Sequence, residues 1–291
     1  MMKSKDPNSE QMPTQATDEL TAATAVVDQC RQKLGGDSES ITALAEALEA
    51  RADLFLRTGE PALACDDFKE AVELIQSSND CYKQLGRLHF GLGMAYNALN
   101  EPGHTATHWE RAIECFEQTQ PPSLIAAASI ANNLGFLKRN DDDFDAAETA
   151  FLKALEIFHT HCGPEDSQTA TVADNLGSLY HFTGYYESAR EMYRLAMEAC
   201  RKSFGDAHPE TARACHKLGI ALVATDDRSG ARRFFEKAFE VFEKKGADHH
   251  DDLLGVAEDF RSLLQDENDI VMAETISQRV RKHAASNGNQ S

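Results

Sequence analysis

The sequence predicts an all-α fold built from a repeated pair of antiparallel helices. Three observations lead to this prediction. The pair Leu-Gly recurs every 42 residues, at positions 92–93, 134–135, 176–177 and 218–219. Alanine, leucine and glutamate are abundant and only 8 of 291 residues are proline, which favours helices. No stretch alternates between apolar and polar residues as a half-buried strand would. A fixed interval of this length is typical of a solenoid, in which each repeat packs on its neighbours.

Other positions recur together with the Leu-Gly pair. A small residue lies 12 residues after the glycine, an aromatic residue 16 after it and an alanine 19 after it. The aromatic residues are Trp109, Phe151, Tyr193 and Phe235, and the alanines are Ala112, Ala154, Ala196 and Ala238. We expect glycine and alanine where the two helices approach closely, with the aromatic ring filling the gap between them.

These residues resemble the tetratricopeptide-repeat pattern, in which Leu-Gly, Ala, an aromatic residue and Ala fall at the same offsets. The 42-residue length and the linker Gly205-Asp206-Ala207-His208-Pro209 are similar to the kinesin light chain type of this repeat. The resemblance covers about residues 38–285. It implies a superhelical solenoid of antiparallel helix pairs with helical caps, which binds a protein or peptide in its concave groove.

The N-terminal elements are predicted from polarity and from helix-ending residues. Residues 1–16 are polar and contain two prolines, so we expect a disordered tail. Residues 17–36 are predicted to form a capping helix, which begins near Asp18 and ends at Gly35-Gly36. This helix would cover the open edge of the first repeat, as the terminal units of solenoids must.

Five repeats and a degenerate sixth are then predicted within a single solenoid, residues 17–285. Their bounds are about 38–78, 79–120, 121–163, 164–205, 206–248 and 249–285, and residues 286–291 are a second disordered tail. Turns rich in Gly, Asn, Asp and Pro separate the two helices of each repeat, as at Thr183-Gly184-Tyr185. In the sixth repeat Phe260-Arg261 replaces Leu-Gly. We interpret this repeat as the C-terminal cap.

Charge and composition exclude several classes of partner. The formal net charge of −19 argues against nucleic acid and against anionic membranes, because both select basic surfaces. No apolar run approaches the ~18 residues of a membrane helix, and the N-terminus lacks the apolar core of a secretion signal. The seven cysteines are scattered and odd in number. They indicate a reducing compartment, so we expect a cytoplasmic protein.

No sequence feature indicates an enzyme, a cofactor or a metal site. The chain has no phosphate-binding glycine loop and no nucleophile elbow. Two clusters contain metal-binding residue types: His159, His161, Cys162 and Glu165, and His249, His250, Asp251 and Asp252. Both fall on segments that link repeats, and neither has the spacing of a closed zinc site. A metal-dependent enzyme is therefore the weakest hypothesis.

The candidate binding site is the predicted inner face of the first helix of each repeat. The 3.6-residue period places two residues before and two after each Leu-Gly pair on this face. The predicted peptide-binding residues are Arg87, Phe90, Met94, Asn97, Asn132, Asn133, Phe136, Arg139, Asn175, Ser178, His181, Arg213, His216 and Lys217. The set is rich in amides and basic groups, whereas the whole chain is acidic.

This composition predicts a ligand of defined chemistry. Asparagine can donate to and accept from a peptide backbone, arginine suits carboxylates, and Phe136 offers an apolar socket. The kinesin light chain resemblance implies that Asn133 and Asn175 help to hold a cargo peptide. We therefore expect a non-enzymatic scaffold or adaptor for an extended acidic or amphipathic peptide. A regulatory subunit that uses its outer or terminal surface is the alternative, and the sequence leaves the oligomeric state open.

Overall fold

The computed structural model of the chain describes residues 11–76 and 81–288. Within these ranges the chain forms thirteen α-helices and one short 3-10 helix, with no strand. The helices belong to two compact units, Met1–Asp141 and Asp142–Ser291. Within these residues, no helix combines the length and the apolar character needed to cross a bilayer.

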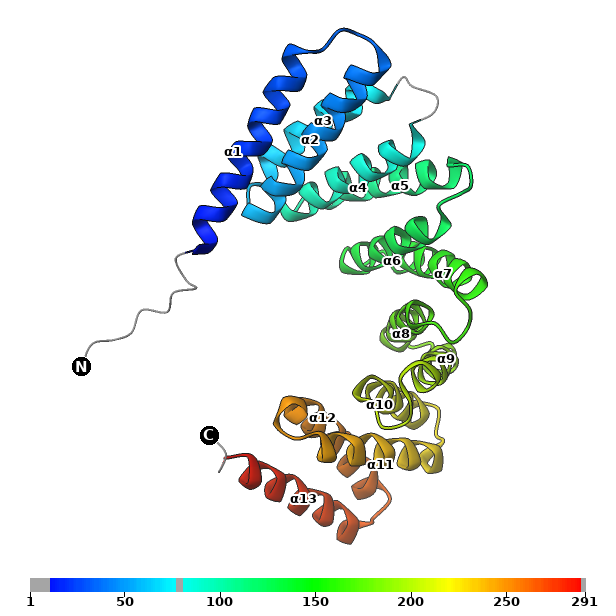
Figure 1. Cartoon of the computed structure of the whole chain (residues 1–291). Coiled ribbons are helices and arrows are strands. Elements are labelled where there is room, and N and C mark those ends of the chain that lie inside the picture. Colours follow the sequence, from blue (N-terminus) through cyan, green and yellow to red (C-terminus); the bar gives the residue numbers. More distant parts are fainter. Residues whose placement is uncertain (1–10, 77–80, 289–291) are drawn as a thin grey trace, which may run out of the picture. The chain divides into compact units, whose positions relative to one another are not determined.

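Unit 1 contains six helices, each in contact with the next along the chain (Figure 1). Their bounds are α1 Gln11–Gln32, α2 Ser38–Thr58, α3 Pro61–Ile75, α4 Tyr82–Ala98, α5 Pro102–Gln118 and α6 Leu124–Asn140. Buried side chains of α2, α3 and α4 form one hydrophobic core, into which Val27 of α1 also packs.

Unit 2, taken by itself, is also built from successive helices. Its elements are α7 Phe144–His161, α8 Ser167–Phe182, α9 Tyr186–Phe204, α10 Pro209–Ala224, α11 Arg228–Lys245, the 3-10 helix Ala247–His249, α12 His250–Asp266 and α13 Ile270–Gly288. Successive helices again contact one another. The core contains the rings of Phe235, Phe239, Phe242 and Phe260, all nearly inaccessible to solvent.

The glycine of each Leu-Gly pair packs against the aromatic residue that lies 16 positions later. This contact is seen in the three such repeats whose two helices belong to the same unit. A Cβ added to Gly93 would lie 2.3 Å from the ring of Trp109, and one added to Gly219 would lie 2.5 Å from Phe235. At Gly177 the nearest atom of Tyr193 would be 2.8 Å away. The predicted close approach of the two helices is therefore confirmed in these three repeats.

Each helix pair turns at one residue in the left-handed backbone region. These residues are Gly59, Asn100, Asp142, Gly184, Asp226 and Asn268, with φ between 59° and 85°. After the first interval of 41 residues, every interval is 42. The 42-residue period thus extends to α12 and α13, although their sequence lacks the Leu-Gly pair.

The helices at the two ends are longer than the sequence predicts. Helix α1 begins at Gln11 rather than at residue 17. Pro13 does not interrupt it, because proline lies in the first turn, where backbone N–H groups have no helical partner in any case. Helix α13 continues to Gly288. The rest of the predicted tails, residues 1–10 and 289–291, lies outside the described residues, as do residues 77–80, which span the predicted boundary between the first two repeats.

Candidate functional site

A cavity of about 300 Å³ lies between α4, α5 and α6 of unit 1. Its lining residues are Met94, Asn97, Trp109, Asn133, Phe136, Leu137 and Asn140. Four of them, Met94, Asn97, Asn133 and Phe136, belong to the set predicted from the sequence. The structure therefore brings part of that set together around one opening.

Helical spacing explains which side chains reach this cavity. Met94 and Asn97 are three residues apart on α4, and Asn133, Phe136 and Asn140 follow one another at intervals of three and four residues on α6, so each group shares one face of its helix. Trp109, the single tryptophan of the chain, is contributed by α5 and is almost fully buried. The cavity thus combines apolar side chains with three amides that can both donate and accept hydrogen bonds.

Arg139 extends the cavity with a positive charge. Its guanidinium carbon lies 5.2 Å from the centroid of the Phe136 ring, a cation–π distance. In the described parts of the chain Arg139 takes part in no ion pair. The preceding residue, Lys138, is directed instead toward Glu110 of α5, with its Nζ 3.9 Å from a carboxylate oxygen.

The other predicted residues of unit 1 have different neighbours. The Arg87 guanidinium donates two hydrogen bonds to the Glu49 carboxylate, at 2.8 and 3.0 Å. Phe90 stacks on Trp109 with the ring centroids 6.3 Å apart and is not among the residues that line the cavity. Asn132 is half-buried and is not among the residues that line the cavity.

In unit 2 the predicted cationic residues are already paired with carboxylates. Arg213 donates to both oxygens of Asp252, at 2.9 and 2.7 Å, and also contacts Glu210. The hydrogen bonds from Arg213, and to a smaller extent the one from His249, hold the pKa of the Asp252 carboxyl below its usual value. The guanidinium of Arg213 is therefore already bound to carboxylates of the chain itself.

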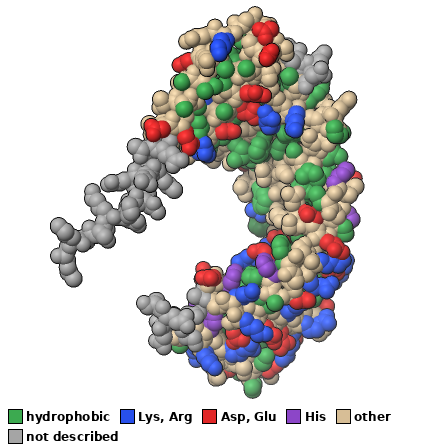
Figure 2. Space-filling model, in the orientation of Figure 1, with side chains coloured by type: hydrophobic (Ala, Val, Ile, Leu, Met, Phe, Trp, Pro, Cys, Tyr) green, Lys and Arg blue, Asp and Glu red, His purple; other side chains and the backbone are tan. Residues whose placement is uncertain are grey.

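The two neighbouring basic residues follow the same pattern. Lys217 Nζ lies 2.6 Å from Asp174 of α8, and His216 Nε2 lies 2.7 Å from Asp259 of α12. Basic and acidic side chains are accordingly interspersed, not separated by sign, over the helices of unit 2 (Figure 2). A cavity of about 390 Å³ between α8, α9 and α10 is lined by Arg213 and Lys217 together with Asp174 and Glu210.

The remaining predicted residues are held inside unit 2. Asn175 is only 9% exposed, so its amide is largely withdrawn from solvent. The Ser178 hydroxyl donates to the Asp174 carbonyl and accepts from the Tyr193 hydroxyl. His181 is half-buried with its ring edge against Tyr186. None of these three side chains is presented openly to a ligand.

The two clusters of metal-binding residue types do not converge. Within residues 11–76 and 81–288, no three His, Cys, Asp or Glu side chains are placed to hold a metal ion. His249 Nδ1 lies 3.1 Å from Asp252, and His250 stacks on His283 with centroids 5.8 Å apart.

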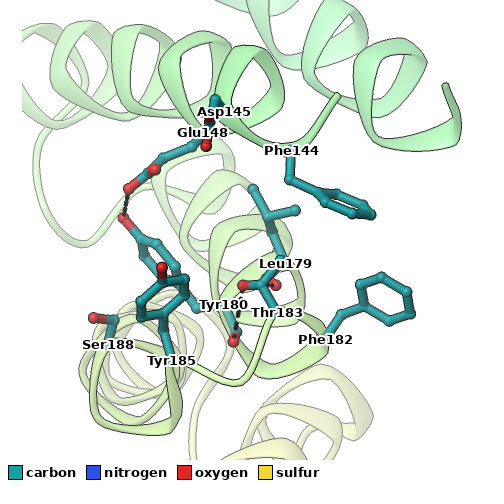
Figure 3. Close-up of a pocket in the computed structure, with 9 residues that line it drawn as sticks. All are labelled: Phe144, Asp145, Glu148, Leu179, Tyr180, Phe182, Thr183, Tyr185 and Ser188. Atoms are coloured by element: carbon teal, nitrogen blue, oxygen red, sulfur yellow. Dashed lines mark hydrogen bonds between the residues drawn. The ribbon is translucent and has the colours of Figure 1, made fainter. Parts of the chain in front are cut away.

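A cavity of about 660 Å³ beside the turn between α8 and α9 was not predicted from the sequence (Figure 3). It is lined by Phe144, Asp145, Glu148, Leu179, Tyr180, Phe182, Thr183, Tyr185 and Ser188. The signal that could have revealed it is the aromatic character of this turn, Phe182-Thr183-Gly184-Tyr185-Tyr186, which the other repeats lack.

Comparison with known proteins identifies the repeat. The tetratricopeptide-repeat family model matches residues 126–202 and 184–244. No curated protein matches the sequence significantly. Many solved structures are similar, at low sequence identity, and they therefore establish the fold alone.

Three of these structures are informative about the fold. The C-terminal part of a TPR repeat-containing protein from Cytophaga hutchinsonii matches with a TM-score of 0.68 at 15% identity, covering 94% of this chain and 96% of that one. BtubC from P. vanneervenii matches at 0.61 and 23% identity, covering 78% and 90%. A Podosopora anserina protein with putative kinesin light chain TPR-like repeats matches at 0.55 and 15%, covering 69% and 95%.

Proposed function

We propose that this chain is a non-enzymatic scaffold or adaptor, because residues 126–244 match the tetratricopeptide repeat, a class of repeat that binds proteins or peptides. We infer that its ligand is an extended peptide segment of a partner protein, which docks at the cavity between α4, α5 and α6. The odd number of cysteines and the burial of the Cys65 and Cys215 thiols support a reducing compartment such as the cytoplasm.

The observation that carries this proposal is the composition of the cavity wall. Met94, Trp109 and Phe136 provide an apolar socket that suits one apolar side chain of the ligand. Asn97 and Asn133 stand beside the socket and can bind the donors and acceptors of an extended peptide backbone.

The positive charge of Arg139 beside the cavity favours an acidic residue in the ligand. Arg139 is the cationic residue of the predicted set that lies against this socket, on the ring of Phe136. A carboxylate next to the apolar anchor of the peptide would gain a charge-assisted hydrogen bond from it. The ligand is therefore an amphipathic peptide in which an apolar residue has an acidic neighbour. The paired cations of unit 2 contribute less, since a ligand would have to displace Asp252, Asp259 or Asp174 first.

Trp109 provides a direct test, because it is the single tryptophan and lines the cavity. Short random peptides displayed on phage would be selected on the full chain, and the enriched sequences synthesised. We expect an apolar residue flanked by Asp or Glu, binding that changes tryptophan emission, and affinity that falls with added salt.

Adjacent residues supply the variant and its matched control. Arg139→Glu should weaken binding of the acidic peptides by about ten-fold or more, and Asn133→Ala should weaken it less. Lys138→Glu makes the same charge change one residue earlier, beside Glu110 and away from the cavity, and should leave binding within about two-fold. If both variants lost affinity equally, the effect would come from long-range electrostatic repulsion and not from a contact at the cavity. If neither substitution matters, the regulatory-subunit alternative, with binding on an outer or terminal surface, is favoured.

A further inference from the structure

We propose that the cavity beside the α8–α9 turn is a second docking site, which takes a basic side chain, arginine or lysine, with an apolar neighbour from a protein partner. This site lies wholly in unit 2 and involves none of the residues proposed above. Its preference for charge is opposite to that of the α4–α6 cavity, so the two proposals can fail independently.

Aromatic rings from two helices, α7 and α8, and from the turn after α8 surround this cavity. Phe144 of α7 and Phe182 of α8 lie on one side, with ring centroids 5.4 Å apart, and Tyr180 and Tyr185 lie on the other, 6.4 Å apart (Figure 3). Phe182 is 71% exposed and Tyr185 is 66% exposed. Rings of this size gain substantial free energy when a partner covers them, and exposed groups of them mark interaction surfaces.

The repeat fold does not require an aromatic residue at position 182. Counting back and forward by the repeat interval from Phe182, the equivalent residues are Arg57, Ala98, Asn140, Ala224 and Asp266. All of them are small or polar. The ring of Phe182 is thus an addition of this one repeat.

Tyr185 departs even further from the pattern of the repeat. The equivalent residues directly before the second helix are all acidic: Glu60, Glu101, Asp143, Asp227 and Asp269. Asp143, Asp227 and Asp269 each accept a hydrogen bond from a backbone N–H of the helix that follows. Among the described residues, Tyr185 makes no such side-chain cap. At this position a helix-capping side chain is replaced by an exposed aromatic ring. Because the replacement gives up the stability of a cap, it indicates that Tyr185 has a role in binding.

The charged groups of this cavity are both carboxylates. Asp145 and Glu148 lie in the first two turns of α7, where the helix dipole stabilises negative charge. Neither of them is in an ion pair in the described part of the chain, and no Lys, Arg or His residue lines the cavity there. This differs from helices α8, α10 and α12, where carboxylates and cations are paired.

The hydrogen bond across the cavity leaves acceptor capacity for a ligand. The Tyr180 hydroxyl donates to Oε1 of Glu148 at 2.5 Å. Burial and this carboxylate both raise the pKa of Tyr180, so the phenol keeps its proton and remains the donor. The second oxygen of Glu148, Oε2, makes no hydrogen bond in the described part of the chain, so it can accept one from a ligand.

Aromatic faces combined with carboxylates select cations. A guanidinium or ammonium group can rest on the rings of Phe182 or Tyr185 while it pairs with Glu148 or Asp145. An acidic peptide, a nucleic acid or an anionic membrane would be repelled by the same carboxylates. The remaining ring surface, on Phe144 and Phe182, suits an apolar residue next to the cation.

The experiment uses the full chain and the same phage-displayed random peptides, with counter-selection on the Phe182→Ala variant. Alanine is the natural residue at the equivalent positions 98 and 224, so this change should leave the fold intact. We expect enriched peptides that contain Arg or Lys beside Leu, Ile, Val or Phe. A synthetic peptide of this kind should bind about ten-fold more weakly to Phe182→Ala, measured by fluorescence polarisation.

Two further variants separate the charge and the ring from the fold. Glu148→Gln keeps an acceptor for the Tyr180 hydroxyl and removes the charge, so it should weaken binding several-fold and reduce the salt dependence. Tyr185→Ser supplies a capping hydroxyl, so it should weaken binding while unfolding at the same or a higher urea concentration. Arg139→Glu is the control for the other cavity and should leave the basic peptide bound.

Several results would overturn this proposal. They are enrichment of acidic peptides, no enrichment after counter-selection, or equal binding to Phe182→Ala and to the unmodified chain. If instead Phe182→Ala converts a dimer to a monomer in light scattering, the occupant of the cavity is a second copy of this chain, and the basic partner is rejected.

Discussion

At the scale of single residues, both units pack a helix glycine directly against an aromatic ring of the paired helix. Gly93 lies against Trp109 and Gly219 against Phe235, with no room for a methyl group. We predict that Gly93→Ala and Gly219→Ala each lower the free energy of unfolding by about 1–3 kcal/mol, because the rings must leave their rotamers or the helices must separate. Urea unfolding followed by circular dichroism would measure this change.

Gly103 is the matched control for that substitution. It lies in the first turn of α5, and an added Cβ would meet nothing within 4 Å in the described structure. Gly103→Ala should therefore raise stability by about 0.4–1 kcal/mol, since it restricts only the unfolded chain. If all three variants were destabilised alike, loss of glycine flexibility would explain the data better than overpacking.

Two histidines in unit 1 make the fold sensitive to acid. His89 and His108 stack with their ring centroids 5.3 Å apart and their Nδ1 atoms 3.1 Å apart. Burial lowers the pKa of each to about 4, from an ordinary value of 6.5. Both rings are thus neutral in the folded state, whereas the unfolded chain takes up protons as the pH falls below 6.5.

This difference sets the direction of the pH dependence. Because the unfolded state binds more protons, the contribution of the pair is complete above about pH 6.5 and is lost progressively toward pH 4. We predict that the melting temperature falls from about pH 7 to about pH 5, and that it falls less in a His89→Phe, His108→Phe variant. Replacing His159 of unit 2, which is exposed and outside this stack, by Ala is the control for the loss of a histidine. An identical slope in the double variant would assign the pH dependence to other groups.

At the scale of the helix pair, the turn residue in the left-handed region sets where the second helix starts. Four repeats use Asn or Asp for this conformation, and Gly59 and Gly184 use glycine. Gly184 has φ of 85° and open space around it in the described structure, so any cost of a side chain arises from the backbone alone.

We predict that Gly184→Ala lowers the free energy of unfolding by about 1–2 kcal/mol, because a Cβ is disfavoured in this region. Gly184→Asn should cost less, since asparagine tolerates this conformation and occupies it at Asn100 and Asn268. Urea unfolding of the two variants would give both values. Equal stability of the alanine and asparagine variants would show that the turn relaxes to another conformation.

At the scale of the whole molecule, the last helix pair covers the apolar face of the repeat before it. Phe260 of α12 packs on Phe235 of α11 at 6.1 Å between ring centroids, and Arg279 of α13 pairs with Glu243 of α11. Deleting residues 250–291 should therefore expose apolar surface and cause association, measurable by light scattering after size exclusion.

The deletion also removes the carboxylate partners of Arg213 and His216. A chain with Asp252→Asn and Asp259→Asn loses those ion pairs but keeps the apolar cover, so it should remain dispersed in the same assay. A truncated chain that stays monomeric and equally stable would show that α12 and α13 are not a protective cap.

The sequence by itself determined the repeated helix pair, its 42-residue period and the packing of glycine on the aromatic ring. These features depend on residues no more than one repeat apart, and helical periodicity makes them visible in a linear chain. Met94, Asn97, Asn133 and Phe136 belong to the set predicted from the sequence, and they line one cavity in the folded chain. Whether these residues bind a peptide stays a prediction.

Only the tertiary structure decided which predicted residues face a neighbouring repeat. Gly91 and Asn175 are equivalent positions, and Gly91 lies directly against Phe68 of the preceding repeat. The period fixes the spacing of a face but not its rotation toward the next helix, so the burial of Asn175 could not be derived. Pairing of Arg213 with Asp252 joins side chains 39 residues apart, and it required both backbones in place. The aromatic cavity at Tyr185 depends in the same way on three helices that meet only in the folded chain.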